Sequence, residues 1–247
     1  MKSLMRTKLR LVSSLILIAG VISLALTYYS RAKAPKTPKA TQGFTLYSTM
    51  FTTPKDGQPV KTGSRVRYQR SDGQFKQETT YYNADGHVRK VDVLFGQPNR
   101  GVFATDENSR TTEFVSTLHP SSIIRSEEDL HQSHRNIIRE DRILGYRVIV
   151  ARPDDDGNGS YTELYHAPDL MGFHIKTAVV NESYKLVIEP TRIVPGDPPE
   201  AALRDDRNYP VSYDLFERKV EALEERGDAQ TANEMKRILD AVKNRKP

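Results

Sequence analysis

A short acidic loop contains the residue types best suited to hold a metal ion. Asp154, Asp156 and Asn158 supply side-chain oxygens at alternate positions, and Gly159 is the sixth residue counted from Asp154. This spacing is typical of the first half of a calcium-binding loop. Position 12 of such a loop carries a bidentate glutamate, but here it is Tyr165. We therefore interpret the segment as a polar hairpin turn, with a weak calcium site as the alternative.

A pair of histidines forms the second candidate metal site. His131 and His134 are three residues apart, and Glu127 precedes His131 by four. On a helix these side chains would share one face and could coordinate a metal such as zinc. Polar neighbours at helical spacing more often form a solvated surface, and we prefer that interpretation. We expect no cofactor.

The sequence contains no recognised catalytic signature. It lacks the nucleophile-elbow, phosphate-loop, dinucleotide-binding and zinc-protease motifs. It also has no cysteine, which excludes thiol catalysis, zinc ribbons and disulfides. A bacterial lipoprotein anchor is excluded for the same reason. We therefore assign no catalytic residues.

The first 29 residues have the pattern of a membrane-targeting segment. Residues 1–10 are basic, and residues 11–29 are uncharged and largely apolar. A helix over the second range spans about 28 Å, close to the ~30 Å hydrocarbon core of a bilayer. We predict a transmembrane anchor at 11–29, with a cleaved signal peptide as the alternative. The segment also has the pattern of an export signal. The expected location is the bacterial inner membrane with the body in the periplasm, or the periplasm itself if the signal is cleaved.

The positive net charge of +5 belongs to this N-terminal segment. Residues 1–34 carry six basic side chains and no acid, which leaves 31 basic and 32 acidic side chains for residues 35–247. A nucleic-acid-binding protein needs a concentrated basic surface. We therefore expect no nucleic-acid partner, and we expect the membrane to be the partner of residues 11–29.

Most of the body alternates between apolar and polar residues. Arg65–Gln69 and Phe173–Val179 are two examples. This period of two predicts antiparallel strands with one covered and one solvated face. Asp72-Gly73 and Asp85-Gly86 separate alternating runs and indicate hairpin turns. We predict strands at about 44–52, 64–70, 75–83, 87–96, 100–106, 110–116, 145–152, 160–167, 173–180 and 184–193.

Helical periodicity occurs in two regions. Apolar spacing between Ser121 and Arg142 predicts a helix, or two short ones, lying on the sheet. Near the C-terminus, Phe216, Val220 and Leu223 share one helical face, and Asp228 could cap a second helix. The C-terminal segment is therefore predicted to be a helical hairpin.

Together these patterns predict an α+β fold class. Its parts are an N-terminal transmembrane helix, a curved antiparallel β-sheet with a packed helix, and a C-terminal helical hairpin. The predicted segments are a basic region 1–10, an anchor 11–29, a linker 30–43, a β domain 44–193, a Pro-rich linker 194–211 and a helical hairpin 212–245.

Three short segments of the β domain carry a resemblance. Leu144-Gly145-Tyr146-Arg147 is followed by Tyr161–Leu170 and then by Phe173-His174-Ile175-Lys176. This order resembles that of exported bacterial LolA-like proteins, the group of lipoprotein carriers and sigma-factor regulators. The resemblance covers about residues 44–193 and implies a curved antiparallel half-barrel with a helix against its concave face. Proteins of this group bind acyl chains or lipoproteins and perform no chemistry.

From the resemblance and the missing catalytic motifs, we expect a membrane-anchored, extracytoplasmic, non-catalytic protein that binds a lipid or lipid-bearing partner in the bacterial cell envelope. The first alternative is a protein-interaction or regulatory module that acts through residues 212–245. The second alternative is an envelope hydrolase that uses carboxylates or His131.

Overall fold

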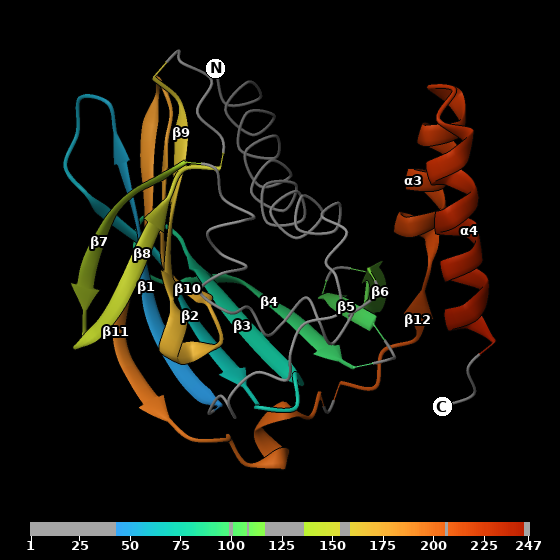
Figure 1. The fold of residues 1–247 in the computed structure, drawn as a ribbon, viewed down its shortest axis with the longest axis horizontal. Coiled ribbons are helices and arrows are strands. Elements are labelled where there is room, and N and C mark those ends of the chain that lie inside the picture. Colours follow the sequence, from blue (N-terminus) through green and yellow to red (C-terminus); the bar gives the residue numbers. More distant parts are fainter. Residues whose placement is uncertain are drawn as a thin grey trace. The chain divides into compact units, whose positions relative to one another are not determined.

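One sheet of twelve strands dominates the structure (Figure 1). The computed structural model describes residues 43–98, 101–107, 109–116, 136–153, 159–205 and 207–244. The strands are β1 (Phe44–Pro54), β2 (Val60–Gln69), β3 (Phe75–Tyr82), β4 (Val88–Gln97), β5 (Gly101–Asp106), β6 (Thr111–Ser116), β7 (Ile137–Ile143), β8 (Tyr146–Ala151), β9 (Tyr161–Ala167), β10 (Phe173–Val180), β11 (Tyr184–Pro195) and β12 (Val211–Ser212).

The strand order is β12-β6-β5-β4-β3-β2-β1-β11-β10-β9-β8-β7. Neighbouring strands are antiparallel except β12, which pairs with β6 in parallel. The chain thus builds the sheet outward from β1 to β6 and then returns from the other edge, from β7 to β11. The last long strand, β11, pairs with β1 along the whole of β1, from Phe44 to Pro54. This pairing joins the two halves of the sheet.

Tight turns account for the first hairpins. Gly73 and Gly86 have positive φ angles of 93° and 83°, which glycine adopts without steric strain. The preceding Asp72 and Asp85 accept hydrogen bonds from the backbone two residues further along the chain. Each of the ten strands predicted from the alternation is present, as β1–β6 and β8–β11.

The helix predicted between Ser121 and Arg142 is wrong for its final third, because residues 137–143 form the edge strand β7. Residues 121–135 lie outside the described residues. A two-residue turn pairs β7 with β8, and both of its residues have positive φ angles, 50° for Leu144 and 86° for Gly145. Two positive φ angles in a two-residue loop are typical of a type I′ hairpin. Leucine is unusual in this conformation, which explains why the turn was not predicted.

The predicted fold class is also wrong. The described residues form mostly a large open antiparallel sheet with two helices, in place of the predicted half-barrel. Alternation predicts individual strands, but it does not determine how many join one sheet. Within the described ranges, neither α-helix has the length and apolar character needed to cross a bilayer. The predicted anchor at 11–29 lies outside the described residues.

Two α-helices, α3 (Asp214–Glu225) and α4 (Ala229–Lys243), lie beside β6 (Figure 1). The chain reverses between them at Gly227, whose φ angle is 79°. Asp228 caps α4 by accepting a hydrogen bond from the backbone N–H of Thr231. The apolar faces of both helices pack on Phe114 of β6, in a cluster formed by Phe114, Phe216, Val220, Ala232, Leu239 and Val242.

Two further apolar clusters lie on the sheet. The larger one combines Phe44 and Leu46 of β1 with residues of β8, β9 and β10, and also with Leu170 of the short 3-10 helix η2 (Pro168–Leu170). The smaller one contains Met50, Leu186 and Ile188. A second 3-10 helix, η3 (Glu200–Leu203), lies in the segment that leads to β12. The two clusters are separated along β1 by Ser48.

Candidate functional site

The sequence-predicted metal sites fall on residues that the structure does not describe. These are Asp154, Asp156 and Asn158 of the acidic loop, and Glu127, His131 and His134 of the histidine pair. Gly159 is described and has a φ angle of 83°, and the loop connects β8 to β9. Among the described residues, no group of three His, Asp or Glu side chains could hold a metal. Both sites stay predictions.

The buried face of β2 is polar, which the sequence pattern did not predict. Arg67 and Gln69 are 8% and 1% exposed, whereas Val66 and Tyr68 are only half-buried. Alternation shows that the two faces of a strand differ, but it does not show which face the fold covers. We call this surface the arginine face and define it by Ser48, Arg65, Arg67 and Gln69.

Arg67 is held between aromatic rings. Its guanidinium carbon lies 3.5 Å from the ring centroid of Phe75 and 5.0 Å from that of Phe173. Its Nη2 donates a hydrogen bond to Gln69 Oε1 at 2.7 Å. Cation–π contacts of this kind position a guanidinium without neutralising its charge.

Several polar atoms of the arginine face have no hydrogen-bond partner although they are buried. They are the Nε atoms of Arg65 and Arg67 and the hydroxyl oxygen of Ser48. Ser48 lies directly opposite Arg65 on the neighbouring strand β1. Buried polar atoms are nearly always satisfied, so three orphans on one face require an explanation.

The environment also disfavours the charged form of both arginine side chains. Burial lowers the pKa of Arg65, and burial followed by repulsion from Arg65 lowers the pKa of Arg67 well below its ordinary value. Neither guanidinium lies within ion-pair distance of a carboxylate of the described residues. Asp92 lies nearby, at the end of the cross-strand row formed by Ser48, Arg65 and Thr79. It is already paired with Lys90 at 2.7 Å.

Phe75, the ring under Arg67, packs tightly against the neighbouring strand. It lies opposite Gly96 of β4, and a Cβ atom at position 96 would lie 2.3 Å from Phe75 Cε1. Gly96→Ala is therefore expected to lower the free energy of unfolding by about 1–3 kcal/mol, because the buried ring must move. Chemical denaturation measures this loss. Val88→Ala, at an exposed position of the same strand, is the control, and equal losses in both variants would contradict the expected clash.

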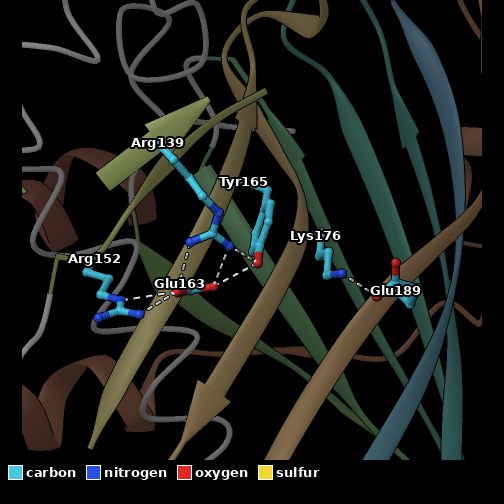
Figure 2. A network of polar contacts seen from close by, with 6 residues as sticks. All are labelled: Arg139, Arg152, Glu163, Tyr165, Lys176 and Glu189. Atoms are coloured by element: carbon cyan, nitrogen blue, oxygen red, sulfur yellow. Dashed lines mark hydrogen bonds and ion pairs between the residues drawn. The ribbon is translucent and has the colours of Figure 1, made fainter. Parts of the chain in front are cut away.

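Glu163 is the centre of a second, fully paired cluster of charges (Figure 2). Its Oε2 accepts hydrogen bonds from Arg139 Nη2 at 3.2 Å and from Tyr165 Oη at 2.7 Å. Its Oε1 accepts a hydrogen bond from Arg152 Nη2 at 2.8 Å. The cluster joins β7 and β9 to Arg152, the residue that follows the end of β8.

These contacts fix the charge states of the cluster. Burial by itself raises the pKa of Glu163, but the hydrogen bonds from Arg139, Tyr165 and Arg152 outweigh it and lower the pKa to about 2. Burial and the hydrogen bond to Glu163 raise the pKa of Tyr165 to about 12. Neither group changes its protonation near neutral pH, as a general acid or base must. We therefore interpret the Glu163 cluster as a structural brace.

Other charges on this half of the sheet form ion pairs nearer the solvent. Figure 2 also shows the pair formed by Lys176 and Glu189, whose Nζ and Oε2 atoms are 2.7 Å apart. Arg147 Nη2 and Glu140 Oε1 are 2.6 Å apart. Exposed pairs of this kind contribute little to stability. A shallow depression of about 370 Å³ lies at the β7–β8 hairpin, lined by Glu140, Asp141, Arg142 and Arg147. Because Glu140 and Arg147 of this depression are already paired with each other, the arginine face is the stronger candidate site.

Comparisons with known proteins give only remote similarities. No protein-family model matches the chain, and no curated protein matches it. Among solved structures, PNGF-II in two crystal forms is 14% and 13% identical, with TM-scores of 0.35 and 0.34 over 81% and 68% of this chain. This chain spans about a third of the length of PNGF-II, at 33% and 31%.

A third similar structure belongs to the group named from the sequence. It is a domain described as an outer membrane lipoprotein-sorting protein, from Vibrio parahaemolyticus. It is 12% identical, with a TM-score of 0.24 over 66% of this chain and 89% of that one. The suspected resemblance to lipoprotein carriers thus has a weak structural counterpart. Scores at this level carry no argument about function.

Proposed function

We propose that this protein is a non-catalytic binding protein for a lipid or a lipid-bearing partner of the bacterial cell envelope. The arginine face supports the proposal, because its unpartnered polar atoms lie between two apolar clusters. Along β1, Leu46 of the larger cluster and Met50 of the smaller cluster lie on either side of Ser48. A ligand with a polar end and an apolar remainder would match both kinds of surface. The periplasmic location inferred from residues 1–29 stays a prediction.

The packing of the C-terminal helices gives less support to a protein-interaction module. The apolar residues of α3 and α4 are buried against each other and against Phe114. The pairs Lys236–Glu224 and Lys243–Glu217 link the two helices on their exposed sides. A partner of these helices would therefore meet a polar surface. The hydrolase alternative named carboxylates or His131, and His131 lies outside the described residues.

Native mass spectrometry of the full chain, purified from bacterial membranes, tests the proposed function. We expect an added mass that corresponds to an acyl-bearing molecule, because a bound lipid would satisfy the orphan atoms of the arginine face. Organic extraction should release the molecule and return the protein to its calculated mass. A stoichiometric protein partner without lipid would favour the protein-interaction alternative instead. A chain that carries neither, and takes up no added lipid, would contradict the proposal.

A further inference from the structure

We propose that Arg65 and Arg67 bind the anionic headgroup, a phosphate or a carboxylate, of an acyl-bearing amphiphile. This inference rests on the proposed function and adds the chemical class of the ligand. The two arginines lie two positions apart on the same face of β2, so their backbones are about 7 Å apart. One headgroup between them could accept hydrogen bonds from both side chains.

The hydrogen-bonding groups available on this face are donors suited to an oxyanion. The Nε atoms of both arginines are buried and unpartnered, and the hydroxyl of Ser48 faces Arg65 from the next strand. Arginine presents its N–H groups in a planar fork that matches carboxylate and phosphate oxygens. Gln69 occupies only the Nη2 group of Arg67.

The charge of the face is left uncompensated by its own residues. The ionisable side chains that share the face across β3 and β4 are Tyr81, Asp92 and Lys90. Asp92 and Lys90 neutralise each other at 2.7 Å. The pKa of Tyr81 is raised by burial and by Asp92, so this phenol is neutral at physiological pH. Two positive charges therefore remain, which selects an anion over a neutral or cationic headgroup.

The surroundings indicate an amphiphile rather than a free ion. Leu46 lies directly opposite Arg67, and Phe44 lies opposite Gln69. Both are almost completely buried members of the larger apolar cluster. The ring of Phe173 contacts Phe44 and also lies 5.0 Å from the Arg67 guanidinium carbon. The proposed headgroup site thus directly adjoins apolar side chains of the larger cluster.

A purely structural role for Arg67 makes a different prediction about stability. A structural cation is needed for folding, so replacing it destabilises the free protein. A cation that serves to bind a ligand lowers the stability of the ligand-free protein, because no counter-charge compensates its burial. We therefore expect Arg67→Met to raise the thermal midpoint of the delipidated full chain by a few degrees. A clear fall in the midpoint of Arg67→Met, with normal folding of wild type, would overturn the inference.

Binding is measured by titration calorimetry on the delipidated full-length protein. The probes are lysophosphatidic acid, a fatty acid, and the neutral monoacylglycerol of the same chain length, together with inorganic phosphate. Wild type should bind the two anionic amphiphiles at least about tenfold more tightly than the neutral one. Arg65→Met and Arg67→Met should each remove most of that preference. Arg67→Lys keeps the positive charge but loses the planar guanidinium. Its preference for anionic amphiphiles should lie between that of wild type and that of Arg67→Met.

Lys61→Met is the matched control, because Lys61 is an exposed cation of the same strand and its loss should leave the preference unchanged. Equal binding of anionic and neutral amphiphiles would overturn the headgroup inference while leaving lipid binding intact. Tight binding of inorganic phosphate alone would also overturn it, since the site would then take a free ion. Failure of every amphiphile to bind would overturn the proposed function itself.

Discussion

Replacing Glu163 with glutamine is expected to lower the free energy of unfolding by about 3 kcal/mol at neutral pH. The carboxylate is 9% exposed and faces two guanidinium groups, those of Arg139 and Arg152. Glutamine keeps the shape of the side chain but removes its charge, which leaves both cations without a counter-charge. The loss is below the largest values for buried pairs because Arg139 is 44% exposed. Urea denaturation of the full chain measures it.

Glu140→Gln is the matched control for this loss. Glu140 is also a glutamate paired to an arginine, Arg147, at 2.6 Å, but its side chain is 56% exposed. Exposed pairs contribute about 0–1 kcal/mol, so the control should change stability little. If the two variants lost the same stability, the brace assigned to Glu163 would be wrong.

The same carboxylate should make stability depend on pH in the acid range. In the folded protein the pKa of Glu163 is lowered to about 2 from its ordinary 4.5, so the folded state favours the charged form. The stabilisation is therefore complete above pH 4.5 and disappears as the pH falls towards 2. Wild type should lose stability relative to Glu163→Gln across this window. Parallel curves for the two proteins would contradict the lowered pKa.

Replacing Phe114 with alanine is expected to lower the free energy of unfolding by about 3–5 kcal/mol. The ring is fully buried and contacts Phe103 at 5.6 Å and Phe216 at 5.0 Å between centroids. It belongs to the apolar cluster that contains residues of both C-terminal helices, and it contacts Phe216 of α3 directly. The cavity left by alanine would weaken the attachment of α3 and α4 to the sheet.

Hydrogen exchange of the full chain reports this attachment directly. At low denaturant, the backbone amides of α3 and α4 should lose protection against exchange in Phe114→Ala. The protection of the amides of the central strands β1 and β11 should change less. Val211→Ala is the control, because Val211 is 50% exposed on the adjacent strand β12 and should change stability by no more than about 0.5 kcal/mol. Unchanged protection of the helices would mean that contacts other than Phe114 hold them.

The two buried charge clusters of the sheet differ in how their charges are compensated. Glu163 receives hydrogen bonds from two arginines and a tyrosine, so every charge near it has a partner. Arg67 is buried and Arg65 is half-buried, both have orphan Nε atoms, and no carboxylate of the described residues lies within ion-pair distance of either guanidinium. A satisfied network stabilises the fold, whereas unsatisfied buried groups require an explanation, which we propose is a bound ligand. This contrast is why we assign the ligand to β2 and structural support to β9.

Much of the strand structure could be predicted from local sequence. Asp72-Gly73 and Asp85-Gly86 form the expected turns, because aspartate and glycine supply the side-chain acceptor and the positive φ angle that tight turns require. The cap of α4 at Asp228 is equally local. Such features depend on a few neighbouring residues, so the sequence alone contains the necessary information.

Residues Ile137–Ile143 show where local pattern was insufficient. Their isoleucines fit helical spacing, yet the segment is a strand because it can pair with β8 through the turn at Leu144-Gly145. Strand pairing is a contact with another part of the chain, and only the assembled sheet provides it. The size of the sheet was unpredictable for the same reason.

The sequence by itself determined the positions of ten strands, their first turns and the apolar stripes of the two C-terminal helices. The tertiary structure decided which face of each strand is buried. In β2 it covered Arg67 and Gln69 and left Val66 and Tyr68 half-buried, the reverse of what hydrophobicity favours. The physical reason is that alternation is symmetric: a shift of one residue exchanges the faces, and only packing against other strands chooses between them. The candidate site depends on that choice, so it became visible only in the folded protein.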